Sequence, residues 1–377
     1  MNLTGNISRR EMLEWSTWGL TGVALTNLVQ ADPRLAISHF PARAKRVVHV
    51  VLMGGLSHID SFDYKPELAK FHGKPLQYKE RPATFFNQIG LIRKNDWAFR
   101  QHGQSGLWVS DLFPYLATCA DELAVVRSMI GTSANHTPAT FEELTGFQLN
   151  GFPVMGSWVS YGLGAETDNL PTYVVFPDSR GYPAGGTINW SNGFLSSAHQ
   201  GVAFGNGDQI IPDLEPAQPI PANTETASRR LLNALNRNEQ ERFGTEDALV
   251  ARMKSHELAA RMQLAIPEVA DMNRESTATR EMYGLNKNET RDFGRNCLMT
   301  RRLLEKGVRF VQLISGGSFG SPRINWDGHE DMRRNHNREA VRIDQPITAL
   351  VKDLKQRGML QDTLILFTSE FGRTPFT

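Results

Sequence analysis

The stretch "RVVHVVLMGG", from Arg46 to Gly55, decides the fold class. After Arg46 it is almost continuously apolar and rich in β-branched valine, and His49 is the one polar interruption. Such a run is typical of a strand in a parallel sheet, where helices cover both faces. The two glycines at its end allow the backbone to turn sharply and to come close to a ligand.

Four more segments repeat this pattern along the chain. We predict strands at "ELAVVRSM", "PTYVVFP", "GVRFVQLISGG" and "DTLILFTSEFG", which span Glu122–Met129, Pro171–Pro177, Gly307–Gly317 and Asp362–Gly372. Helix-like segments precede the last two, and this alternation predicts a three-layer α/β/α sandwich with a largely parallel sheet. A polar region at about residues 224–288 carries apolar residues at three- and four-residue spacing, which predicts amphipathic helices packed on the sheet.

The composition argues against several classes of protein. Hydrophobic residues make up 40% of the 377 residues and charged residues 21%, as in ordinary globular domains. The formal net charge is +1, so no electrostatic feature favours nucleic acid or an anionic membrane as a partner. Cys119 and Cys297 are the two cysteines, and because they are far apart in sequence we expect buried thiols rather than a disulfide framework.

The N-terminus resembles an export signal. Twin arginines, Arg9 and Arg10, precede the mildly apolar segment Trp15–Val29, which is too short and too polar for stable membrane insertion. The pattern is similar to a twin-arginine signal, which would direct the protein to the periplasm or outside the cell. The alternative is an amphipathic helix with a chance arginine pair. We therefore divide the chain into a signal and linker at residues 1–44 and an α/β domain at residues 45–377.

Carboxylate and imidazole side chains follow three of the predicted strands. Asp327 and His329 come after "FVQLISGG", Glu370 comes after "LILFTS", and His58 and Asp60 come after the Gly-Gly turn. Open α/β sheets bind ligands at the carboxyl ends of their strands, and these side-chain types bind divalent metal ions. We predict a metal site at this edge, for zinc, calcium or magnesium. The alternative is a set of exposed polar loops.

Several motifs together resemble one protein family. "MGGLSHIDSFDYKPEL", "NHTPATFEELTG", "PVMGSWVSYGLG", "WDGHED" and "LFTSEFGRTP" are similar to motifs of the secreted proteins grouped as domain of unknown function 1501. That family is similar to the sulfatase and alkaline phosphatase superfamily, whose members use metal ions and a nucleophile at a strand end. The resemblance implies an alkaline-phosphatase-like fold and metal dependence. It also implies that the chain is truncated at its C-terminus, because the family continues past Thr377 with a further histidine motif.

The segment "ANHTPATFEELTG" matches the nucleophile loop of that superfamily in position but not in chemistry. The superfamily's nucleophile lies nine residues before the Thr of a Thr-Gly pair, and His136 occupies this position relative to Thr145. A hydroxyl or thiol is expected there. We therefore name His136 and its neighbour Thr137 as candidates for nucleophile or base. In the structural interpretation of the same segment, Asn135 or Thr137 caps a helix.

Two functions are compatible with these features. The leading hypothesis is an exported, metal-dependent hydrolase of phosphate or sulfate esters, acting on a small-molecule or polysaccharide substrate. The alternative is a catalytically inactive, sulfatase-like protein that binds a sulfated polysaccharide or a cell-surface partner. The set of metal-ligand residues favours the first hypothesis, and the missing hydroxyl favours the second. The sequence leaves the oligomeric state open.

Overall fold

The computed structural model describes residues 41–81, 89–205, 210–211, 220–243, 247–320 and 322–376. The chain divides into two units, Met1–Ala44 and Lys45–Thr377, and the second contains the sheet. The predicted export signal, with Arg9 and Arg10, lies outside the described residues. Within the ranges given above, no helix is both long and apolar enough to cross a bilayer.

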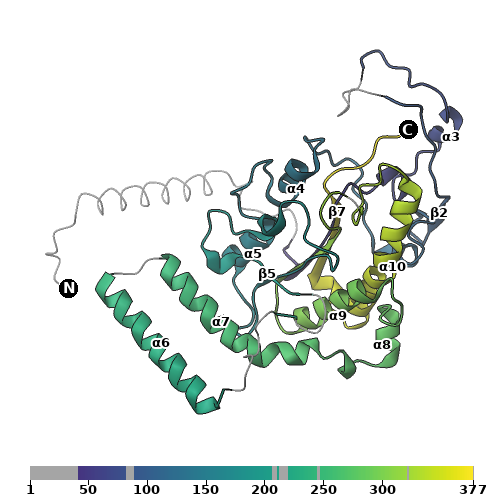
Figure 1. Cartoon of the computed structure of the whole chain (residues 1–377). Helices are drawn as coiled ribbons and strands as arrows, with labels where there is room; N and C mark the ends of the chain where they lie inside the picture. Colours follow the sequence, from purple (N-terminus) through teal and green to yellow (C-terminus); the bar gives the residue numbers. More distant parts are fainter. Residues whose placement is uncertain are drawn as a thin grey trace. The chain divides into compact units, whose positions relative to one another are not determined.

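A five-stranded sheet, in which all neighbouring strands are parallel, forms the centre of the second unit (Figure 1). The strand order is β5-β4-β6-β1-β7. The bounds are Arg46–Leu52 for β1, Tyr173–Phe176 for β4, Val202–Ala203 for β5, Phe310–Ser315 for β6 and Thr363–Ser369 for β7. Strand β1 pairs with both β6 and β7, so that Val50 lies opposite Leu313 on one side and Phe367 on the other. The predicted parallel sheet is confirmed, and the carboxyl ends of these three strands lie side by side.

Helices and short elements connect the strands. The α-helices are α3 (Glu67–Phe71), α4 (His136–Thr145), α5 (Met155–Leu163), α6 (Ala222–Phe243), α7 (Asp247–Ala270), α8 (Thr277–Met282), α9 (Arg291–Glu305) and α10 (Met332–Gln356). Strands β2 (Phe99–His102) and β3 (Leu107–Ser110) form an antiparallel pair. The 3-10 helices are η1 (His58–Asp60), η2 (Leu116–Glu122), η3 (Gly186–Trp190), η4 (Ser197–His199), η5 (Met272–Arg274) and η6 (Leu360–Asp362).

Helices cover both faces of the sheet, which gives the three predicted layers. Successive side chains of a strand point to opposite faces. Val48 and Val50 of β1 belong to a core that includes buried residues of α9 and α10, whereas Val51 belongs to a second core with Leu144 of α4. Figure 1 shows α4 and α5 on one side of the sheet and α9 and α10 on the other. Both faces are therefore buried, as the continuously apolar sequence of β1 requires.

The strand predicted at Glu122–Met129 is wrong. Glu122 ends the 3-10 helix η2, and residues 123–129 contain no strand. Their side chains are largely uncovered: Val126 is 66% and Met129 80% exposed. A β-branched run becomes a strand only where a neighbouring strand offers backbone hydrogen-bond partners. Among the described residues, no strand pairs with residues 123–129.

The polar region predicted at about residues 224–288 forms α6, α7 and α8. The C-terminal half of α7 contributes Met262, Ile266 and Val269 to the larger core. On α6, by contrast, Leu231 and Leu235 are 62% and 53% exposed. The predicted packing on the sheet therefore applies to α7, which shares this core with Val48 and Val50 of β1, and not to the exposed leucines of α6.

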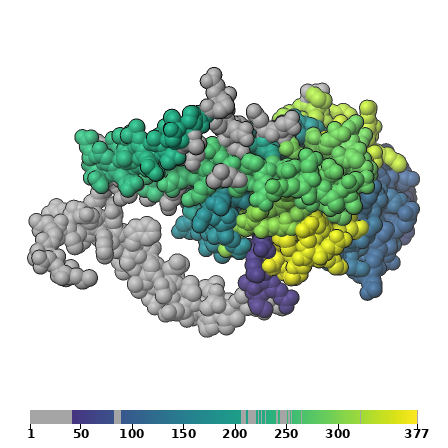
Figure 2. Space-filling model, turned by 90° about the horizontal axis from the view of Figure 1, so that it is seen from below, coloured from purple at the N-terminus to yellow at the C-terminus, as the bar shows by residue number. Residues whose placement is uncertain are grey.

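The C-terminal residues lie against the segment near residue 92. Phe376 forms an isolated antiparallel bridge with Ile92, and the Arg93 N–H donates to the Pro375 carbonyl over 2.9 Å. In the space-filling view the yellow C-terminal part adjoins the blue segment (Figure 2). Both cysteines are buried and unpaired, as expected.

Candidate metal centre

The loop that carries Asp327 and His329 is tied to the end of β1. The Trp326 N–H donates to the Met53 carbonyl over 2.8 Å, and the Trp326 side chain is fully buried. A Cβ atom on Gly54 would lie 2.5 Å from the Asp327 nitrogen, and Gly54 has φ = 115°. Both the contact and the dihedral require glycine. The Gly-Gly turn therefore lets the Asp327 loop pack directly on β1.

His136 reaches the same edge of the sheet from the start of α4. Asn135 is the N-cap, and its Oδ1 accepts a hydrogen bond from the Thr137 N–H over 3.3 Å, so the capping interpretation holds for Asn135. The His136 ring lies between two phenyl rings, with centroid distances of 4.4 Å to Phe319 and 4.7 Å to Phe371. These contacts fix the plane of the imidazole.

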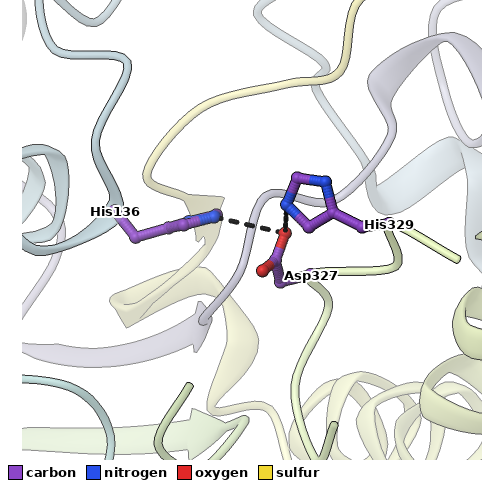
Figure 3. Close-up of side chains that lie close together, drawn as sticks. All are labelled: His136, Asp327 and His329. Atoms are coloured by element: carbon purple, nitrogen blue, oxygen red, sulfur yellow. Dashed lines mark ion pairs between the residues drawn. The ribbon is translucent and has the colours of Figure 1, made fainter. Parts of the chain in front are cut away.

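His136, Asp327 and His329 converge in space (Figure 3). Asp327 Oδ1 lies 2.7 Å from His329 Nε2 and 3.3 Å from His136 Nε2. One ligand atom from each residue lies within 4.8 Å of the others. Tetrahedral ligands placed about 2 Å from an ion lie roughly 3 Å apart, so small movements would suffice to hold a zinc-like ion.

Glu370 supports His136 from behind. Its Oε1 lies 2.6 Å from His136 Nδ1, and its carboxylate also accepts hydrogen bonds from the Gly54 N–H at 2.9 Å and the Gly55 N–H at 3.2 Å. The Glu370 side chain has no solvent exposure. Because a carboxylate accepts, His136 Nδ1 donates to Glu370, and Nε2 is the ring nitrogen that faces Asp327. In the absence of a metal ion Nε2 donates to the Asp327 carboxylate, and a bound ion would displace that proton. A carboxylate that orients a histidine in this way is characteristic of metal sites.

Two arginines pair with Asp327. Arg373 donates from its terminal nitrogen to Asp327 Oδ1 over 2.8 Å, and Arg323 donates to Oδ2 over 2.7 Å. Arg373 also donates to the carbonyl groups of Gly55, at 2.8 Å, and Trp326, at 3.2 Å. It therefore fastens the Gly-Gly turn to the Asp327 loop and brings positive charge to the site.

Electrostatics favour the ligand forms of Asp327 and His329. Burial opposes ionisation of Asp327, but the hydrogen bonds from His136 and Arg373 outweigh it and hold its pKa well below the usual value. Burial lowers the pKa of His329, which favours the neutral imidazole that binds a metal ion. For His136, burial is outweighed by hydrogen bonds to Asp327 and Glu370, which raise its pKa. A metal ion would therefore compete with a proton at His136.

The family model described as "Protein of unknown function (DUF1501)" matches residues 44–377. The chain belongs to this family. No curated protein and no solved structure matches it. In this DUF1501 chain the site therefore has to be interpreted from its own geometry.

The other predicted site residues of the DUF1501 chain lie near the cluster but outside it. His58 Nδ1 accepts a hydrogen bond from the Arg373 N–H over 3.3 Å. Asp60 accepts from the Ser57 hydroxyl and from the Asp96 N–H, each over 2.7 Å, and so holds loops together. The Thr137 hydroxyl makes no hydrogen bond within the described part of the chain, whose contacts to Thr137 involve its backbone.

Sequence reasoning missed the residues that surround the three candidate ligands. Phe319 and Phe371 contact the His136 ring, and no sequence pattern around either phenylalanine predicts this contact. Arg373 lies in the motif "SEFGRTP", three residues after Glu370, and its position after a strand was a usable signal. Arg323 precedes Asp327 by four residues in the same polar loop.

Proposed function

We propose that this chain is a divalent-metal-dependent hydrolase of phosphate or sulfate esters. The observation that carries the proposal is the convergence of His136, Asp327 and His329, with Glu370 fixing the orientation of His136. Two imidazole nitrogens and one carboxylate favour zinc over calcium or magnesium, which prefer oxygen ligands. Such an ion, when bound, polarises an ester oxygen and lowers the pKa of a water molecule.

The geometry supports His136 as a ligand rather than a nucleophile. Both of its ring nitrogens face carboxylates, Glu370 at 2.6 Å and Asp327 at 3.3 Å, so neither is free to attack an ester. Among the described residues, the hydrogen bond to Thr137 involves its backbone N–H and not its hydroxyl. We therefore propose water, and not Thr137, as the nucleophile. His329 is 48% exposed, which leaves the solvent-facing side of the cluster open to a substrate.

The arginines support an anionic substrate. Arg323 is 29% exposed and contacts Asp327, so its guanidinium borders the proposed ion. Guanidinium groups match the oxygen geometry of phosphate and sulfate and favour the charge of these esters. Export by the twin-arginine route is part of the same proposal and rests on Arg9 and Arg10.

One observation favours the second candidate, a protein that binds a sulfated polysaccharide or a cell-surface partner without catalysis. Both oxygens of Asp327 already pair with arginines, Oδ1 with Arg373 and Oδ2 with Arg323. A closed ion-pair cluster of this kind can persist without a metal ion and still present positive charge to an anionic partner. Metal-dependent hydrolysis therefore decides between the two candidates.

The experiment is a calorimetric titration of the chelator-treated full chain with zinc, followed by hydrolysis assays with 4-nitrophenyl phosphate and 4-nitrophenyl sulfate. We expect one ion per chain, weaker binding by His329→Ala, and unchanged binding by the exposed control His256→Ala. Metal-dependent release of nitrophenol supports the hydrolase. Stoichiometric binding without hydrolysis of either ester supports the non-catalytic candidate, and absence of saturable zinc binding overturns the metal centre.

A further inference from the structure

Aromatic side chains form a connected surface over α5 and the loops beside it. Their ring centroids lie 3.9 Å apart for Phe147 and Phe152, 6.3 Å for Phe152 and Phe194, 5.8 Å for Phe194 and Trp158, and 6.0 Å for Trp158 and Tyr161. We call these five residues the aromatic patch. The exposed fraction is 52% for Phe147, 44% for Trp158, 60% for Tyr161 and 65% for Phe194. A contiguous exposed apolar patch of this kind marks an interaction site.

The segments that carry the aromatic patch contain no charged residue. Residues 144–165 and 181–205 lack Asp, Glu, Lys and Arg, although these types make up 21% of the chain. The two segments are joined in space, because the Val154 N–H and the Ser157 hydroxyl both donate to the Ser191 carbonyl, over 3.3 and 3.1 Å. Depletion of charge together with enrichment of aromatic residues is typical of the centre of a protein–protein interface.

An open pocket of about 450 Å³ adjoins the aromatic patch at Trp158. Residues of both α4 and α5 line it, and its apolar lining consists of Leu144, Met155, Trp158, Val159 and Leu163. Glu143 also lines the pocket, and burial raises the pKa of this carboxyl to about 8, which favours its neutral form. Pockets with an apolar lining receive the anchor side chains of a partner protein. The surface therefore combines exposed rings with a recess that a ring can fill.

We propose that the aromatic patch joins two copies of this chain in a dimer with a two-fold axis, in which an exposed ring of each copy enters the pocket of the other. A two-fold axis brings the same surface of both copies together, so a charge near the axis would face its own kind. Like charges brought together across an interface oppose association. A patch without charge avoids this repulsion. Because rings and pocket lie on one surface, that surface is self-complementary, as a two-fold interface requires.

The exposed area is close to what a stable dimer needs. Leu163, which lines the pocket, is itself 60% exposed. With about 200 Å² for each large side chain, the four exposed rings and Leu163 present roughly 550 Å² to solvent. Each copy in a stable dimer contributes roughly 600–1,000 Å², and the small uncharged residues between the rings add to the total. Just after α5, Glu166 and Arg309 form an ion pair of 2.9 Å, which gives the surface the polar rim typical of interfaces.

The proposed dimer does not use the residues of the candidate metal centre. His136 begins α4, whereas Glu143 of the pocket lies about 10 Å further along the helix axis, at roughly 1.5 Å per residue. The proposal therefore does not rest on the proposed function. Dimer formation and metal binding can each hold or fail without the other.

Sedimentation velocity of the full chain, in chelator and over a concentration series, tests the proposal. We expect a monomer–dimer equilibrium that ends at the dimer. Tyr161→Lys and Phe194→Lys should each raise the dissociation constant at least about tenfold, because the new charge enters the interface twice and meets its own copy. Leu231→Lys is the matched control, since this leucine is 62% exposed on α6, outside the aromatic patch, and the variant should dimerise as the native chain does.

Three outcomes would overturn the proposal. A native chain that stays monomeric at every concentration would leave the patch to a different partner, and this outcome needs no variant. Assembly beyond the dimer would exclude a closed two-fold interface. Association of both patch variants with native affinity, or loss of association in Leu231→Lys, would assign the contact to another apolar segment, such as α6 or Trp15–Val29. Zinc titration of the two patch variants should match that of the native chain, so failure here is distinguishable from failure of the metal centre.

Discussion

His136 Nδ1 and Glu370 Oε1 lie 2.6 Å apart, although 234 positions separate the two residues in the sequence. This hydrogen bond sets which ring nitrogen of His136 faces Asp327. Glu370 can act in this way because the backbone N–H groups of Gly54 and Gly55 hold its carboxylate in place. The orientation of the candidate ligand therefore depends on four chain segments that meet at one edge of the sheet.

Replacing Glu370 by glutamine tests this orientation. The amide would place N–H donors where the Gly54 and Gly55 N–H groups also donate, so the side chain should turn and release His136. We expect zinc affinity to fall by about 10- to 100-fold, as for other supporting partners of metal-bound histidines. Calorimetric titration measures the affinity, with the exposed Glu289→Gln as control. Unchanged affinity would mean that Glu370 does not orient His136.

Replacing Asp327 by asparagine should abolish zinc binding and destabilise the fold. The change removes the charge that pairs with Arg323 and Arg373, and Arg373 is only 16% exposed. Loss of one partner from a largely buried ion pair costs about 3 kcal/mol of unfolding free energy. Urea denaturation of the metal-free protein measures it, with the exposed Asp168→Asn as control. A stability equal to that of the native chain would contradict the assigned pairing.

The depressed pKa of Asp327 predicts that the effect of Asp327→Asn on the unfolding free energy depends on pH. The folded pKa of Asp327 is depressed, so its contribution to stability is fully present above the unfolded pKa and is lost as the pH falls through the folded value. The unfolded value is about 3.9. The difference in unfolding free energy between the native chain and Asp327→Asn should thus be constant near neutral pH and shrink below about pH 4. A difference that instead grew on acidification would refute the depressed pKa.

Glu143 should show the opposite behaviour. Burial raises its pKa to about 8, and the charge of Glu370 adds to the effect. Its Oε1 accepts from Thr368, whereas Oε2 is buried and has no hydrogen-bond partner among the described residues, which suits a protonated acid. Above pH 4 to 5 the unfolded chain loses this proton while the folded chain keeps it, so stability falls by roughly 1.4 kcal/mol per pH unit up to the folded pKa. Glu143→Gln should remove this slope between pH 5 and pH 8 in denaturation curves.

Export is tested by changing the arginine pair. If Arg9 and Arg10 form a twin-arginine signal, the double change Arg9→Lys, Arg10→Lys should retain the protein inside the cell, because receptor recognition of the signal depends on this pair. Fractionation of the source cells measures the distribution, and Arg43→Lys, outside the pair, is the control. Arrival of the double variant on the outer side of the membrane would favour the chance arginine pair.

Local sequence patterns determined the strands and the loops that carry chemistry. The apolar runs that became β1, β4, β6 and β7 were recognisable because both faces of a parallel strand are buried. Asp327, His329 and Glu370 were recognisable as candidates because side chains after parallel strands meet at one edge. The same reasoning was wrong at Glu122–Met129, where apolar β-branched residues lie exposed in a loop because no strand of the described residues pairs with them.

Tertiary structure alone decided the roles of these side chains. That Glu370 contacts His136 and that Asp60 joins neighbouring loops both depend on contacts between segments far apart in sequence. A periodic pattern records which face of an element is buried, because burial of apolar surface acts on every residue of that face. A hydrogen bond joins two particular atoms, and its partner is set by the order of the strands and the packing of the helices, which no local pattern specifies.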